Sequence, residues 1–379
     1  MLDRFLSGVE YVGNKLPEPF TIFVILFLIT GVASTVMAWM GIAVQVPGSD
    51  EVSEVNGLFT GEGLAWLTTT MAENYIGFPP LLTVLPILLA VGVAERSGML
   101  SALIRQLFGS ARTAVLPYAV GVIGVTASVM GGSAFVVVPP LAAMVFKAAG
   151  RHPVAGLIGG FAAVGAGYST ALVPTGLDAL FAGITNAVMD TLPGAGYSTV
   201  TPLSNYFFNV ASSVVLGLVT GYIIDRILEP RLRAQDVPQD ESVDAADAAE
   251  RGDRDAEGNA LTAALGPKER KALWMSLLAG LVLTAVILAA VLIPGSPWRN
   301  GEGGFLPESP LLDSIVFIIC AYFWGFGITY GAVVGTIKGM ADVVTMMMGA
   351  LKDMLSFLVL AFIPVSYTHL RAHETPEHL

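Results

Sequence analysis

Asp178 is the only acidic residue in the segment from Gly165 to Gly183, which otherwise holds small, apolar and hydroxyl-bearing residues. An ionisable side chain inside a bilayer costs roughly 3 kcal/mol or more, and it persists where a cavity, a partner or a cargo compensates it. Pro174 removes a backbone donor, and Gly176 allows the chain to turn. We therefore expect the helix to open there and restart near Asp178, a combination typical of a transport path.

Two roles are open for the Asp178 carboxylate. A helix that restarts with Thr175 or Asp178 near its first turn presents free N–H groups and a positive dipole end, which suit an anionic group. In the simpler interpretation, Asp178 only caps its own helix. The two roles are compatible with each other.

A second candidate segment, 128–133, reads Ser-Val-Met-Gly-Gly-Ser. Basic residues flank its apolar surroundings at Arg112 and Lys147, so the chain should enter the membrane and return to the same side. The stretch is short for two full spans, which favours a re-entrant hairpin whose backbone is buried in protein or lines water. Two short helices joined by a glycine turn and packed through small residues are the alternative.

We hypothesise that this hairpin and the broken helix face each other near the membrane midplane, with Asp178 binding the coupling cation or an amine of the cargo. Ser169 and Asn205 are also ordinary candidates for helix packing. The predicted substrate- or ion-binding residues are Asp178, Gly176, Thr175, Pro174, Ser133, Gly132, Ser169 and Asn205. No catalytic residue, metal ligand or cofactor is expected beyond a coupling proton or sodium ion.

The composition indicates a membrane protein. Hydrophobic residues make up 54% of the 379 residues, charged residues only 13%, and the mean hydropathy is +0.71. An ordinary soluble domain does not have this composition. Apolar runs long enough to span about 30 Å of hydrocarbon are Phe20 to Met40, Tyr75 to Ala94, Phe207 to Ile224, Leu273 to Ile293 and Ser314 to Val334.

The single cysteine, Cys320, lies within an apolar run and is expected to be a packed thiol, so redox chemistry is set aside. The loop from Gln45 to Asn74 carries five acidic residues and no Lys or Arg, which places it outside the cell. Basic residues before the first span and after the second place those segments inside. We expect a multi-pass protein of the bacterial inner membrane with a cytoplasmic N-terminus.

The expected fold is all-α and polytopic, with a re-entrant hairpin and broken helices, of the inverted-repeat transporter type. Its first membrane part covers residues 1–224, with the hairpin near 113–147 and the broken helix near 153–190. A hydrophilic cytoplasmic linker covers 225–271 and shows no phosphate-binding or nucleic-acid signature. A second, incomplete membrane part covers 272–365.

The last residues, 366–379, turn abruptly polar and carry three of the four histidines. Their irregular spacing argues against a metal site, and the run resembles translated sequencing-adapter DNA, so we expect a non-native tail.

Several blocks of the sequence resemble the AbgT family of aminobenzoyl-glutamate and antimetabolite transporters, and they cover most of the chain before Val365. The stronger blocks are 12–17 (VGNKLP), 91–98 (VGVAERSG), 139–143 (PPLAA), 150–156 (GRHPVAG) and 177–185 (LDALFAGIT). Weaker matches are 229–232 (EPRL) and 352–354 (KDM).

The resemblance implies dimers of bowl-shaped subunits, each with nine spans and two re-entrant hairpins around a water-filled basin. It implies a small-molecule cargo, p-aminobenzoyl-glutamate or sulfonamide-type antimetabolites, moved by a proton or sodium gradient in a lipid membrane. Two departures matter. The family's first hairpin usually has an acidic residue where this chain has Gly132, and its second hairpin would follow Val365, where it is absent.

Three other functions remain as alternatives. One is a transporter of other small carboxylates. Another is an intramembrane aspartate-dependent hydrolase, which would need a second carboxylate to share a proton with Asp178. The available ones, Asp190, Asp313 and Asp342, lie near span ends. A channel is less favoured because rings of charge and repeated carbonyl filters are not evident.

Overall fold

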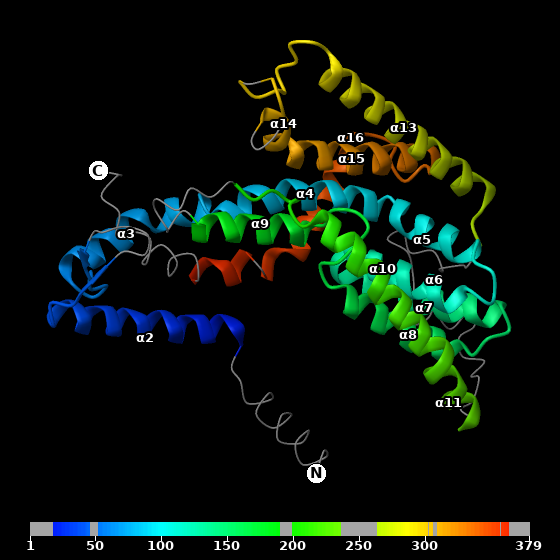
Figure 1. The fold of residues 1–379 in the computed structure, drawn as a ribbon, viewed down its shortest axis with the longest axis horizontal. Coiled ribbons are helices and arrows are strands. Elements are labelled where there is room, and N and C mark those ends of the chain that lie inside the picture. Colours follow the sequence, from blue (N-terminus) through cyan, green and yellow to red (C-terminus); the bar gives the residue numbers. More distant parts are fainter. Residues whose placement is uncertain are drawn as a thin grey trace. The chain divides into compact units, whose positions relative to one another are not determined.

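The computed structural model describes residues 18–45, 52–189, 199–235, 264–301, 303–305, 309–356 and 358–363. Most of these residues form helices (Figure 1), and one short antiparallel pair joins β1 (Ala43–Gln45) to β2 (Val52–Glu54). The all-α polytopic fold class is confirmed. The centre of the predicted linker, 236–263, and the predicted tail, 366–379, lie outside the described residues.

Six helical runs in the described part of the chain are long and apolar enough to cross a membrane, and they overlap all five spans expected from the sequence. They are Pro19–Trp39, Gly61–Arg96, Leu116–Ala148, Tyr206–Ala234, Pro267–Leu292 and Ile315–Val334. Both ends of the predicted linker are helical, because one helical run continues to Ala234 and the next begins at Pro267.

The chain divides into two compact units, the first comprising Met1–Leu81, Thr185–Tyr197 and Asp353–Leu379. Its long helices are α2 (Pro19–Trp39) and α3 (Gly61–Ile76). Hydroxyls of Ser34 and Thr35 on α2 accept hydrogen bonds from the backbone N–H groups of Leu58 and Phe59, at 3.2 and 3.0 Å. These bonds hold the segment before α3 against α2.

The second unit comprises Leu82–Ile184 and Ser198–Lys352. It contains each of the remaining helices, either completely or for the larger part of its length. They are α4 (Pro79–Arg96), α5 (Met99–Gly109), α6 (Leu116–Thr126), η1 (Ala127–Ser133), α7 (Ala134–Ala148), α8 (Pro153–Gly167), α9 (Gly176–Met189), α10 (Tyr206–Ile223), η2 (Ile224–Leu228), α11 (Glu229–Ala234), α13 (Pro267–Leu292), α14 (Pro310–Asp313), α15 (Ile315–Val334) and α16 (Met340–Asp353). Here α6, α7, α8 and α10 form one bundle, and α13 lies along α15 (Figure 1).

Small residues bring the helices of this bundle close together. A Cβ atom added to Gly121 on α6 would lie 2.0 Å from the carbonyl oxygen of Gly217 on α10, so only glycine fits there. This is the packing expected where lipid surrounds the helices and backbones must approach closely. Helices α2 and α13, by contrast, are apolar around much of their circumference and largely exposed, as suits helices that face lipid.

Candidate functional site

The run from Leu116 to Ala148 folds back on itself. As one straight helix, its 33 residues would extend roughly 50 Å. Yet Nη1 of Arg151, just after the run, donates to the carbonyl oxygen of Thr113, just before it, at 3.1 Å. The first arm, α6, has 11 residues, or roughly 16 Å, and cannot cross about 30 Å of hydrocarbon. The chain thus turns back between the two basic flanks, which is the geometry that a re-entrant hairpin requires.

The hairpin turns within η1, at Gly131. This residue has φ 58° and ψ −134°, a conformation that favours glycine because it lacks a Cβ atom. Gly131 and Gly132 are exposed, whereas Ser128 is buried. The predicted tip is therefore correct, and its first residue points into the bundle.

The helix after the hairpin is broken, as Pro174 predicted, but the break begins earlier than expected. Helix α8 ends at Gly167, and Tyr168 follows with a left-handed φ of 42°. Helix α9 starts at Gly176, whose φ is not positive. The expectation that Gly176 provides the turn is thus not met, because the positive φ lies at the other end of the break, at Tyr168.

Asp178 and Thr175 cap the start of α9. One carboxylate oxygen of Asp178, Oδ2, accepts hydrogen bonds from the Thr175 backbone N–H at 2.7 Å and from its hydroxyl at 2.8 Å. The Thr175 hydroxyl in turn accepts the Asp178 N–H at 3.3 Å. This reciprocal arrangement is a capping box, which satisfies donors that the helix start leaves open. The capping role weighed for Asp178 is therefore present.

The other carboxylate oxygen of Asp178 has a different partner. Nδ2 of Asn209, on α10, donates to Oδ1 of Asp178 at 2.6 Å, and both residues are 9% exposed. Asn205, the asparagine predicted from the sequence, lies one turn earlier and is exposed. A polar amide inside the apolar run Phe207 to Ile224 was the available signal, and it points to Asn209, because Asn205 lies before that run.

The hairpin tip, the break and α10 meet around Thr170. The Ser128 hydroxyl donates to the Thr170 carbonyl oxygen at 3.2 Å, and the Ser212 hydroxyl of α10 donates to the Thr170 hydroxyl at 3.5 Å. At the next turn of the break, the Tyr206 hydroxyl donates to the carbonyl oxygen of Leu172 at 3.4 Å. Polar side chains from two elements, η1 and α10, thus line the interruption.

The remaining predicted site residues are less closely joined. Ser133 and Ser169 are half-buried and Gly132 is exposed, and no hydrogen bond in the described part of the chain links them to Asp178. Pro174 lines a mainly apolar groove of about 780 Å³, together with Met130 and Leu172. The structure therefore brings together Thr175, Gly176 and Asp178 from the predicted set.

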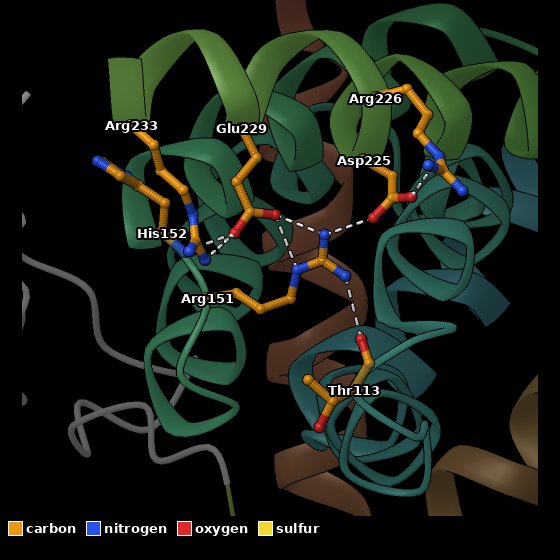
Figure 2. A network of polar contacts seen from close by, with 7 residues as sticks. All are labelled: Thr113, Arg151, His152, Asp225, Arg226, Glu229 and Arg233. Carbon is orange, nitrogen blue, oxygen red and sulfur yellow. Dashed lines mark hydrogen bonds and ion pairs between the residues drawn. The ribbon is translucent and has the colours of Figure 1, made fainter. Parts of the chain in front are cut away.

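A network of charged residues joins the end of the hairpin to η2 and α11, which follow α10 directly (Figure 2). The Arg151 guanidinium lies between two carboxylates, donating to Oε2 of Glu229 from Nε at 2.8 Å and to Oδ1 of Asp225 from Nη2 at 2.5 Å. Oε1 of Glu229 accepts from the His152 backbone N–H at 3.2 Å and from Arg233 at 2.7 Å. Two sequence blocks that resemble the family, around residues 151 and 229, are thus in direct contact.

The surroundings of Arg151 stabilise its charge. Burial by itself lowers the pKa of this guanidinium, but the hydrogen bonds to Glu229 and Asp225 outweigh burial, and its pKa is raised. Arg151 therefore remains a cation, which the two carboxylates require because they are themselves largely removed from water.

Comparison with known proteins agrees with this architecture. The model of the AbgT putative transporter family matches residues 4–370. The chain belongs to the AbgT family. Its curated relatives include the p-aminobenzoyl-glutamate transport protein of Escherichia coli (strain K12), which is 30% identical over 362 residues. That match covers 95% of this chain and 66% of the relative, so the chain spans about two thirds of the relative's length.

Two solved structures of AbgT transporters have a similar fold. MtrF of Neisseria gonorrhoeae, described as one of a class of antimetabolite efflux pumps, gives a TM-score of 0.83 at 32% identity, covering 97% of this chain and 71% of MtrF. The YdaH transporter of Alcanivorax borkumensis gives 0.79 at 28% identity, covering 94% and 71%. The family's relatives are named as transporters, and the chain is not assigned to an enzyme class.

Proposed function

We propose that this AbgT protein is a secondary active transporter of p-aminobenzoyl-glutamate or sulfonamide-type antimetabolites, driven by a proton or sodium gradient. The family match and the names of the two relatives support the choice of cargo. The observation that carries the proposal is the Asp178 carboxylate, which is buried at the start of a helix that is broken next to a re-entrant hairpin.

Asp178 is the proposed site for the coupling cation or for an amine of the cargo. An ionised carboxylate offers about four acceptor positions. Thr175 occupies two of them through its N–H and hydroxyl, and Asn209 occupies a third. About one acceptor position remains, and Asp178 keeps 9% of its surface exposed. A small cation or a single N–H group could therefore be added without breaking the existing hydrogen bonds.

The hydrolase alternative is not supported at this position. Such an enzyme would need a second carboxylate sharing a proton with Asp178. In the part of the chain that the structure describes, the side chains hydrogen-bonded to the Asp178 carboxylate are those of Thr175 and Asn209. Asp190 lies outside the described residues.

We further propose that the protein works as a homodimer in the bacterial inner membrane, with its N-terminus in the cytoplasm. The orientation rests on the basic residues that flank the first spans. The Arg151 network would then lie on the cytoplasmic side, because Arg112 and Lys147 flank the same end of the hairpin.

The test is gradient-driven accumulation and counterflow of labelled p-aminobenzoyl-glutamate in proteoliposomes. Asp178→Asn should lower gradient-driven accumulation by about tenfold or more, equivalent to about 1.4 kcal/mol of lost interaction, because it removes the charge that attracts the cation. Counterflow by the unaltered protein would distinguish a carrier from a channel.

Asp342→Asn is the matched control. Asp342 is also an acidic residue in the first turn of a helix, and its Oδ2 accepts the backbone N–H groups of Lys338 and Gly339 at 2.7 and 3.1 Å. Replacing it changes a helix start without touching the proposed site, so transport should persist. Normal accumulation by Asp178→Asn would refute the proposal.

A further inference from the structure

We propose that Asn209 is the positioning residue of the Asp178 carboxylate and makes α10 respond to the charge state of Asp178. This inference rests on the proposed function, because it concerns how the same site is held and coupled to the rest of the protein.

The two carboxylate oxygens of Asp178 accept hydrogen bonds from different elements. Oδ2 is held within the first turn of α9 by Thr175. Oδ1 is held from another helix, 31 residues further along the chain, by Nδ2 of Asn209 at 2.6 Å. With both ends of the contact 9% exposed, water competes little for this hydrogen bond. The bond fixes the rotation of the carboxylate and joins α9 to α10.

A hydrogen bond of this kind depends on charge. An N–H donor binds an ionised carboxylate roughly twice as strongly as it binds a neutral acceptor. When a proton or sodium ion neutralises Asp178, the attraction on Nδ2 of Asn209 therefore weakens. Binding of a proton or sodium ion to Asp178 therefore weakens the hydrogen bond between α9 and α10 that Asn209 makes.

Other polar residues of α10 do not act in the same way. The Ser213 hydroxyl is fully buried and donates to the carbonyl oxygen of Asn209 at 2.7 Å, within its own helix. The Ser212 hydroxyl donates to the same carbonyl oxygen at 3.2 Å. Asn205 is exposed and contributes no side-chain cap to α10. A helix-packing asparagine would need only some hydrogen-bond partner, whereas the Asn209 amide donates to the buried Asp178 carboxylate.

The experiment measures cation-dependent stabilisation of the purified full chain in detergent. A ligand that binds only the folded state raises the unfolding midpoint. Sodium chloride is titrated against choline chloride at constant ionic strength, and pH is varied in a parallel series. The variants are Asn209→Leu, the matched control Asn205→Leu on the same helix, Asp178→Asn, and Asp178→Asn combined with Asn209→Leu.

The unaltered protein and Asn205→Leu should show the same cation-dependent rise in midpoint. Asn209→Leu should need about tenfold more sodium ion or proton for half of that rise, in line with the loss of a hydrogen bond to a charged group. Asp178→Asn should abolish the cation dependence, and adding Asn209→Leu should then change only the baseline midpoint. If Asn209→Leu is not recovered folded, Asn209→Ala, which also removes the amide donor without adding a charge, is measured in its place.

The outcomes separate the two proposals. A cation effect that persists in Asp178→Asn, or that is missing from the unaltered protein, removes the proposed ion site. If Asp178→Asn abolishes the effect while Asn209→Leu titrates like Asn205→Leu, the ion site stands and the positioning role of Asn209 is overturned.

Discussion

Asp178 combines a structural and a proposed functional role because its two carboxylate oxygens face different elements. Oδ2 completes the capping box with Thr175, and Oδ1 faces α10 through Asn209. The two interpretations that the sequence left open are therefore not rivals. A helix start supplies N–H donors for a carboxylate, and the same donors lower the cost of burying its charge.

The Thr175 hydroxyl can be tested separately from the charge of Asp178. Thr175→Val keeps the shape but removes the hydroxyl that donates to Asp178 and accepts its N–H, so the free energy of unfolding should fall by about 1 kcal/mol. Thr175→Ser keeps the hydroxyl and should lie close to the unaltered protein. The measurement is the thermal unfolding midpoint in detergent. Equal midpoints for the Val and Ser variants would argue against the capping box.

At the scale of elements, the hairpin depends on one backbone conformation at its turn. Gly131 and Gly132 are adjacent, and an added Cβ atom would meet no other atom within 4 Å at either position. They differ in their backbone, because only Gly131 has a positive φ, of 58°. A comparison of alanine substitutions at Gly131 and Gly132 therefore isolates the cost of backbone strain, because neither added Cβ atom would be crowded.

This pair gives a prediction for the hairpin itself. Gly131→Ala should reduce the free energy of unfolding by about 1 to 3 kcal/mol, because alanine is strained at this φ and ψ. Gly132→Ala should stay within about 0.5 kcal/mol of the unaltered protein. Denaturant titration of the two purified variants provides the comparison. A larger loss for the Gly132 variant would place the turn elsewhere.

The sequence predicts the elements better than it predicts their contacts. Basic residues on both flanks were enough to predict the hairpin, and Pro174 was enough to predict a broken helix, since both signals are local. The left-handed Tyr168 could not be anticipated, because tyrosine does not favour a positive φ. The contact of Asn209 with Asp178 could not be predicted, because the position of α10 relative to α9 depends on tertiary packing.

At the scale of the whole molecule, the Arg151 network ties together segments that are far apart in the sequence. Arg151 and Glu229 are separated by 78 residues, and Thr113 joins the same cluster from the start of the hairpin. The network therefore joins both ends of the hairpin to η2 and α11, which continue the helical run of α10 (Figure 2). The same helical run contacts Asp178 through Asn209.

Removing Arg151 should therefore destabilise the protein as a whole. Arg151→Gln leaves the carboxylates of Glu229 and Asp225, whose side chains are 4% and 19% exposed, facing each other without the cation between them. Arg233 still pairs with Glu229 and Arg226 with Asp225, so the expected loss is that of the hydrogen bonds to the Arg151 charge, about 1.5 to 3 kcal/mol. The unfolding midpoint of Arg151→Gln should fall accordingly, and the yield of folded protein in the membrane should fall with it.

Arg226→Gln is the control for this network, because Arg226 also contacts Asp225, at 3.2 Å, but its side chain is 69% exposed. Its loss should change the free energy of unfolding by less than about 1 kcal/mol. Arg151→Lys should fall between the two, since an ammonium group replaces the charge but cannot reach Glu229, Asp225 and the Thr113 carbonyl oxygen together. If Arg151→Gln were no less stable than Arg226→Gln, the anchor would have to lie in the close packing of α6 against α10.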